Sequence, residues 1–195
     1  MKNMERESLR ELKKEADAAF NNRDFEQAFT LSERLAKENI PSAIFTCGLI
    51  MEKGWLHGNK DFDRALYFYR DLVLKFNDEE GYLGCVRIFL ARRDLSNRDK
   101  AIEYCLGATK GRLKHLAFLL LGNVYEELYI PPEYKLARSA YLKSFFSGSA
   151  WGLRKHAMSM MKSNNIIGGV FMHIIATVVS PLFAIFGGLR TTRKG

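Results

Sequence analysis

An alanine recurs in this chain at intervals of 37, 36 and 36 residues, each time within the same short phrase. The phrase is an acidic or amide residue, usually an aromatic residue, two further residues and the alanine, and it occurs at Asp24–Ala28, Asp61–Ala65, Asn97–Ala101 and Glu133–Ala137. A fixed period of roughly 20–50 residues is typical of stacked structural repeats. Because such arrays present an extended surface, the period also favours binding over catalysis.

The spacing of apolar residues between these phrases predicts pairs of helices. Asp24 is expected to cap the second helix through its side-chain oxygen, and Gly54 to end the third helix with a positive φ. No single pair can bury its apolar face, so the pairs must stack. The sequence therefore predicts an all-α solenoid of helical hairpins in residues 1–160, with hairpins over about 5–38, 41–77, 79–111 and 114–148 and a further helix from Ser149.

Residues 41–152 resemble the Sel-one-like repeat, a longer-looped relative of the tetratricopeptide repeat. The repeat has Leu-Gly on its first helix, a glycine after that helix, and Asp-x-x-Lys-Ala-x-x-Trp-Tyr on its second helix. This chain matches at Gly48, Gly54, Asp61–Tyr69, Leu83-Gly84, Asp99-Lys100-Ala101, Gly111, Leu121-Gly122, Lys135–Ala137 and Tyr141. The second and third units lack the glycine-rich loop. The resemblance implies a right-handed α-solenoid and carries little information about function.

The glycines of the motif have a physical explanation that does not depend on the family. Gly48, Gly84 and Gly122 are expected to let paired helices approach closely, with the recurrent alanines at the tight point on the facing helix. The aromatic residues one turn later are expected to fill the space between successive hairpins: Phe68, Tyr69, Tyr104 and Tyr141.

The resemblance also implies a binding surface, lined by the first helix of each hairpin. A surface that mixes aromatic, aliphatic and amide side chains suits an extended or helical peptide. For each residue taken alone, packing of helix on helix is an equally good interpretation. The implied positions are Phe45, Leu49, Glu52, Cys85, Ile88, Leu119, Asn123 and Glu126.

Charge is distributed unevenly along the chain. The net charge of +8 combines −3 in residues 1–80 with +11 in residues 81–195, and no acidic residue follows Glu133. Such an excess attracts anionic surfaces, whether lipid headgroups, nucleic acid or an acidic protein.

The segment from Ile166 to Leu189 contains no Asp, Glu, Lys or Arg. As a helix it would be roughly 36 Å long, enough to cross a hydrocarbon layer of about 30 Å. Residues 161–195 are therefore predicted to form a membrane-inserting tail that tethers the repeats on the cytoplasmic side. A hydrophobic helix that caps the solenoid, an interfacial or re-entrant segment and an oligomeric plug are the alternatives. The basic residues expected at the membrane are Arg154, Lys155, Lys162, Arg190, Arg193 and Lys194.

No catalytic, metal-ligating or phosphate-binding motif is present, so neither an enzyme nor a cofactor is predicted. The three cysteines, an odd number, indicate reduced thiols rather than a disulfide scaffold. The sequence thus favours a non-enzymatic adaptor or scaffold that binds a protein or peptide at a membrane, of which an immunity or regulatory partner is a narrower version. The alternative is a soluble solenoid with a buried terminal helix that binds nucleic acid or an acidic partner. The oligomeric state stays open.

Overall fold

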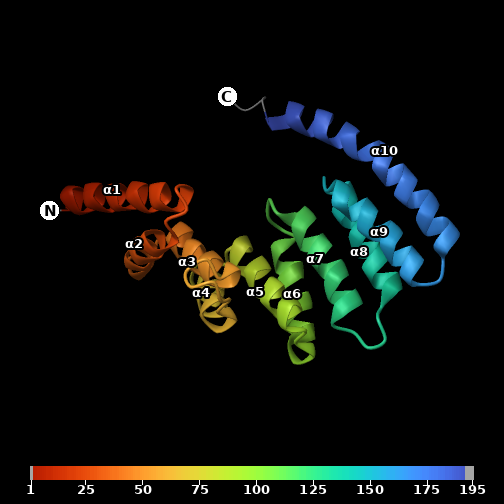
Figure 1. The fold of residues 1–195 in the computed structure, drawn as a ribbon, viewed down its shortest axis with the longest axis horizontal. Coiled ribbons are helices and arrows are strands. Elements are labelled where there is room, and N and C mark those ends of the chain that lie inside the picture. The colour runs from red at the N-terminus through yellow and green to blue at the C-terminus, as the bar shows by residue number, and fades with distance from the viewer. Residues whose placement is uncertain (1, 192–195) are drawn as a thin grey trace. The chain divides into compact units, whose positions relative to one another are not determined.

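The computed structural model describes the backbone of residues 2–191 and the side chains of residues 7–179 and 181. Within this part the chain consists of ten α-helices and one 3₁₀ turn, with no β-strand (Figure 1). It divides into two compact units, unit 1 over Met1–Ile88 and unit 2 over Phe89–Gly195. The sequence-based boundary at residue 160 does not coincide with this division, because it falls near the end of a helix inside unit 2.

Unit 1 contains two complete helix pairs and most of a fifth helix. The side chain of Asp24 accepts a hydrogen bond from the backbone N–H of Gln27 at 3.1 Å, and Asp61 accepts one from Arg64 at 2.9 Å. Gly54 ends the third helix with φ 70°, a left-handed conformation that a glycine adopts without steric cost. Both predicted helix-end signals are confirmed. The helices are α1 (Lys2–Asn21), α2 (Phe25–Lys37), α3 (Pro41–Lys53), α4 (Phe62–Phe76) and α5 (Glu79–Arg92).

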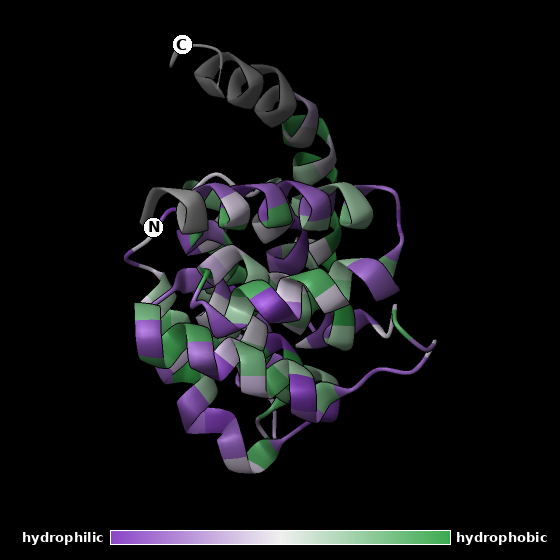
Figure 2. Ribbon diagram, turned by 90° about the vertical axis from the view of Figure 1, so that its left-hand side faces the viewer, coloured by the Kyte–Doolittle hydropathy of each residue, from purple (hydrophilic) through white to green (hydrophobic). Residues whose placement is uncertain are grey.

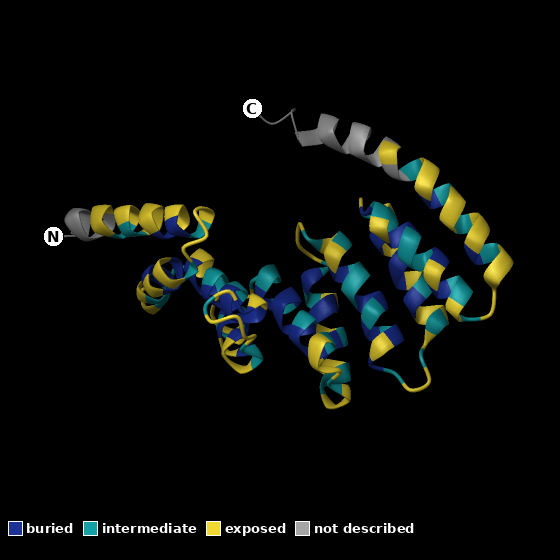
Figure 3. Cartoon of the chain, in the orientation of Figure 1, coloured by how far each residue is buried: buried dark blue, intermediate teal, exposed yellow. Residues whose placement is uncertain are grey.

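Unit 2 takes up the end of α5 and continues with helices that pack in chain order. Helix α7 packs on α8, α8 on α9, and α9 on α10. Figure 3 shows that the buried residues lie where neighbouring helices meet and that the outer faces are exposed. The elements are η1 (Leu95–Asn97), α6 (Arg98–Ala108), α7 (Lys114–Glu127), α8 (Tyr134–Phe146), α9 (Ala150–Lys162) and α10 (Ile166–Thr191).

The recurrent alanines lie on the second helix of each pair and are completely buried. Ala28, Ala65, Ala101 and Ala137 have a relative exposure of 0%. A larger side chain would force the helices apart at these crossings, since protein interiors are close-packed. The period in the sequence thus reflects a repeated packing position.

The motif glycines allow close approach, as predicted, but the residue that fills the space is a tyrosine. A Cβ atom on Gly48 would lie 2.8 Å from Cε1 of Tyr69, and one on Gly84 would also meet this ring. In unit 2 a Cβ on Gly122 would overlap the ring of Tyr141. The flat tyrosine ring therefore occupies the room that the missing side chain of each glycine leaves.

Candidate protein-binding surface

The first complete motif helix, α3, leaves part of one face open to solvent. Phe45 and Leu49 are half-buried on this face, while Ile44, Cys47 and Ile50 point into the core of unit 1. The ring of Phe45 lies 6.1 Å from that of Tyr69, so a buried aromatic ring supports its inner edge. The two predicted residues are therefore held on a rigid helix and remain partly accessible.

Glu52, at the end of this face, is the centre of a buried hydrogen-bonded cluster. Its Oε2 accepts a hydrogen bond from the hydroxyl of Tyr69 at 2.7 Å. Arg87 on α5 donates from Nη2 to the same oxygen at 2.7 Å and from Nε to Oε1 at 3.0 Å. Lys53 also donates to Oε1, at 3.1 Å. Glu52 was predicted to line the surface, yet its side chain is only 8% exposed, so it acts mainly in joining three helices.

Glu52 and Arg87 each stabilise the ionised form of the other. Burial alone would raise the pKa of Glu52, but the hydrogen bonds and positive charge of Arg87, with smaller contributions from Tyr69 and Lys53, hold that pKa below its ordinary value. Burial would likewise lower the pKa of Arg87, and the contact with Glu52 raises it instead. Burial raises the pKa of Tyr69, and the hydrogen bond to Glu52 adds to that rise. At neutral pH the cluster is therefore an ion pair of Glu52 and Arg87 beside the neutral hydroxyl of Tyr69, and its role is structural rather than acid–base.

Unit 2 has a similar surface on α7, with a weaker cluster. Leu119 and Asn123 are half-buried, and Asn123 accepts a hydrogen bond from the hydroxyl of Tyr141 at 3.0 Å. Glu126 is buried and accepts one hydrogen bond, from Lys162 on α9 at 2.6 Å. Its other oxygen, Oε1, is buried and has no hydrogen-bond partner in the described structure. In both units the glutamate of a first helix therefore binds a cation from the next first helix along the chain.

Two further residues that were predicted to line the surface lie in the protein interior. Cys85 and Ile88 on α5 have a relative exposure of 0%. They cannot touch a partner in this structure, because α5 is buried on nearly every side from Gly81 to Phe89. The available sequence signal was the absence of a polar stripe over residues 82–90, because a helix without one is covered on all sides. Only Arg87 and Tyr82 interrupt the buried run.

The basic residues predicted at the membrane have partners within unit 2 where their side chains are described. Lys162 binds Glu126, the Nζ of Lys155 lies 6.0 Å from the ring centroid of Tyr141, and the guanidinium of Arg154 lies 5.5 Å from that of Trp151. Lys155 and Lys162 thus point toward α8 and α7. Of the remaining three predicted residues, Arg193 and Lys194 lie outside the described residues, and only the backbone of Arg190 is described.

The predicted membrane segment, Ile166 to Leu189, falls on α10, and its side chains are described for residues 166–179 and 181. Over the part that is described, none of the helices combines the length and the apolar character needed to cross a bilayer. The transmembrane interpretation thus gains no support from the structure.

Sequence reasoning did not identify the partners of the two glutamates. Arg87 follows Glu52 by 35 residues, and Lys162 follows Glu126 by 36. These spacings are close to the repeat intervals of 37, 36 and 36 residues, so a cation about one period after a first-helix glutamate was the available signal. Without a structure it could not be separated from the many other basic residues of this chain.

Comparison with known proteins identifies the fold. No family model matches the sequence, and no curated protein matches it either. Among solved structures the chain is similar to a Sel1 repeat protein from Oxalobacter formigenes, with a TM-score of 0.58 and 17% sequence identity. The match covers 78% of this chain and 64% of that one, so the chain spans less than two thirds of its length.

The chain has a Sel1-like repeat fold. The α-solenoid of stacked helical hairpins predicted from the sequence is confirmed. At 17% identity the likeness extends to the fold alone and says nothing about what this chain binds. Function therefore has to be argued from the surfaces of this chain.

Proposed function

We propose that this Sel1-like chain is a non-enzymatic scaffold that binds a protein or peptide partner on its first-helix surfaces. The observation that carries this proposal is the pair of half-exposed stripes, Phe45 and Leu49 on α3 and Leu119 and Asn123 on α7. Each stripe lies beside a glutamate fixed by a cation from the next hairpin. A surface ordered before binding loses little conformational entropy on association, which favours affinity.

The mixture of side chains on these stripes indicates the kind of partner. Aromatic and aliphatic groups offer apolar contact, and the Asn123 amide and the partly exposed head of Lys162 offer polar contacts. An extended or helical peptide with apolar anchors and an acidic group suits this combination.

Affinity capture with the full chain tests the proposal. The charge substitutions Leu49→Glu and Leu119→Glu would each place a carboxylate in one stripe, and we expect a partner that copurifies in a fixed ratio to be lost. Matched controls are Leu74→Glu in unit 1 and Phe146→Glu in unit 2, since these side chains are 83% and 81% exposed on second helices. A partner lost equally from all four variants, or retained by all four, would contradict the proposal.

We also propose that the scaffold works at a membrane surface, to which α10 attaches it. A tether raises the effective concentration of the binding surfaces for a membrane-bound partner without adding any contact. The support for this location is the set of large apolar side chains that α10 exposes, among them Ile167 and Phe171. Cell fractionation of the full chain tests it, with recovery wholly in the soluble fraction as the contradictory result.

A further inference from the structure

The described part of α10 has two apolar faces, and only one of them is covered. On the inner face, Gly169 and Ala176 are buried. A Cβ on Gly169 would meet Met161 and lie 2.9 Å from the carbonyl oxygen of Ala157, both on α9. The absence of a side chain at this position lets α10 approach α9 closely, so the inner face belongs to the core of unit 2.

The outer face of α10 carries a stripe of large apolar side chains. Ile167 is 88% exposed, Phe171 64%, Ile174 58% and Val178 65%. The spacing of four, three and four residues places them in one line along the helix. Figures 2 and 3 show hydrophobic and exposed residues together along this part of α10. We call these four residues the outer stripe.

A helix face of a soluble repeat array that no neighbouring helix covers is normally polar. Exposed apolar side chains in a continuous line mark a contact with a protein or a lipid surface instead. The described outer face offers His173 and Thr177 as its polar exceptions.

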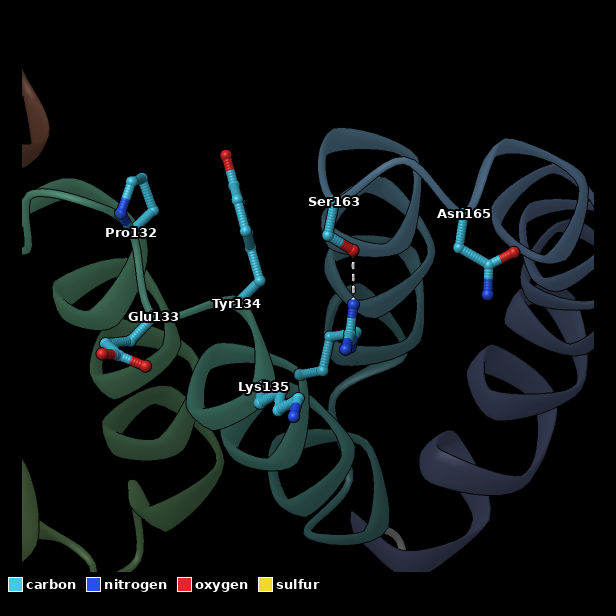
Figure 4. A pocket seen from close by; sticks show the side chains of 7 residues that line it. Pro132, Glu133, Tyr134, Lys135, Ser163 and Asn165 are labelled. Carbon is cyan, nitrogen blue, oxygen red and sulfur yellow. Dashed lines mark hydrogen bonds between the residues drawn. The ribbon is translucent and has the colours of Figure 1, made fainter.

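A basic pocket lies beside the first turn of α10. Lys135 and Arg138 of α8 line it together with Ser163 and Asn165 of the turn between α9 and α10 (Figure 4). Arg138 donates a hydrogen bond to the hydroxyl of Ser163, and Lys135 is exposed, with no ion-pair partner among the described residues. Glu133 also lines the pocket, along with Pro132 and Tyr134, which leaves a net charge of +1.

The charge beside the start of α10 distinguishes between the possible occupants of the outer stripe. Helices α8 and α9 carry six basic residues and no acidic one, and of these Lys135 and Arg138 reach the pocket beside α10, whereas Lys155 and Lys162 point toward α8 and α7. A second copy of this chain would bring two positively charged surfaces together, which is unfavourable. A phospholipid surface with anionic headgroups instead provides negative charge and an apolar layer within a few ångströms of each other.

We infer that α10 lies along an anionic phospholipid surface, with the outer stripe in the acyl boundary and a lipid phosphate at Lys135 and Arg138. The helix then binds in the plane of the membrane, as amphipathic helices do, and need not cross it. This inference rests on the proposed membrane location and is independent of partner binding.

Flotation of the purified full chain with vesicles tests the inference. We expect the chain to float with vesicles of phosphatidylcholine mixed with phosphatidylglycerol and to bind phosphatidylcholine alone much more weakly. The neutral substitutions Lys135→Gln and Arg138→Gln together should weaken binding to the anionic vesicles by about thirtyfold, since each basic residue near such a surface strengthens binding by about fivefold. The outer-stripe variant, Ile167→Ser with Ile174→Ser, should abolish flotation, and the exposed-residue control, Leu74→Ser with Phe146→Ser, should float as the wild type does.

A fluorescent label gives a second reading that does not depend on comparing the folding of variants. The three native cysteines are buried, so a cysteine introduced at position 174 can be labelled selectively with an environment-sensitive dye. Its emission should shift to the blue on anionic vesicles, and the same dye at position 74 should not respond. Equal binding to both vesicle types would overturn the inference and leave the membrane location intact, and no binding to either would overturn both. A dimer in sedimentation that Ile167→Ser and Ile174→Ser dissolve would show that a second copy occupies the stripe.

Discussion

Removal of the Glu52 carboxylate tests whether the cluster of Glu52, Tyr69 and Arg87 holds unit 1 together. The variant Glu52→Ala leaves the Tyr69 hydroxyl and the Arg87 guanidinium without the acceptor that they share. Loss of one partner from a buried ion pair costs about 3–5 kcal/mol of unfolding free energy. The side chain of Arg87 is 29% exposed and can turn toward water, so we expect about 3 kcal/mol, the lower end of this range.

Replacement of the whole cluster should have a much smaller effect. The triple variant Glu52→Met, Tyr69→Phe, Arg87→Met removes both charges and the hydroxyl together, which leaves no buried polar group without a partner. Apolar replacements of buried ion pairs are often neutral or stabilising, so this variant should lie within about 1 kcal/mol of the wild type. A large loss from the single change with little loss from the triple change is the signature of a desolvated ion pair.

The assay is urea denaturation followed by the fluorescence of Trp55. Trp55 belongs to unit 1 and stacks on Phe25 with ring centroids 4.6 Å apart, so its emission reports on this unit. The second tryptophan, Trp151, is 62% exposed in unit 2 and can be replaced by Phe in every variant. A loss of less than about 1 kcal/mol from Glu52→Ala would refute the reasoning, because the cluster would then contribute no more than a surface ion pair.

The cluster also predicts how stability depends on pH. Arg87 and Tyr69 hold the pKa of Glu52 below its ordinary value of 4.5. A carboxylate with a lowered pKa stabilises the folded state fully above about pH 4.5, and this contribution is lost as the pH falls through the folded-state pKa. Below pH 4.5 the wild type should therefore lose stability faster than the triple variant. Parallel curves in this range would contradict the assignment.

Three further predictions follow from the packing of the described residues. Gly122→Ala should destabilise unit 2 by about 1–3 kcal/mol through overlap with the Tyr141 ring, and a melting temperature equal to that of the wild type would argue against the close approach. Burial lowers the pKa of His156, so unit 2 should lose stability as the pH falls through 6.5. The variant His156→Gln, which has no group that titrates at this position, should show a smaller drop in melting temperature between pH 7 and pH 5. Burial raises the pKa values of Cys47 and Cys105 to about 12, so iodoacetamide at pH 8 should modify these thiols slowly in the native protein and quickly in urea, and rapid native modification would contradict their placement in the core.

The sequence predicted the repeated architecture because local signals and packing signals coincide in this chain. The buried alanines recur with the period of the hairpins, the capping aspartates Asp24 and Asp61 occur in the first two of them, and Gly54 ends one first helix. Each signal depends on the identity of a single residue, such as a missing side chain or a side-chain oxygen at a helix start. Signals of this kind can be recognised in the sequence without a structure.

The surfaces were harder to predict because burial depends on more than one neighbouring helix. Cys85 and Ile88 are three residues apart and Leu119 and Asn123 four apart, so each pair can share one face of its helix, yet the first pair is completely buried and the second pair is not. Lys162 is a basic residue near an apolar segment in the sequence, and only the fold places it beside Glu126. The sequence predicts that the segment forming α10 is apolar. Which side of this helix is covered depends on the close approach of Gly169 to α9, and only the structure shows it.

Site-specific photo-cross-linking in cells tests the central claim, that the first-helix surfaces of this Sel1-like chain bind a partner, most directly. A photoreactive amino acid at position 49 in unit 1 or 119 in unit 2 should give one dominant cross-linked protein, and the same group at position 74 or 146 on the second helices should not. A dominant product from positions 74 and 146, with none from 49 and 119, would contradict the account and place the binding surface on the opposite faces of the hairpins.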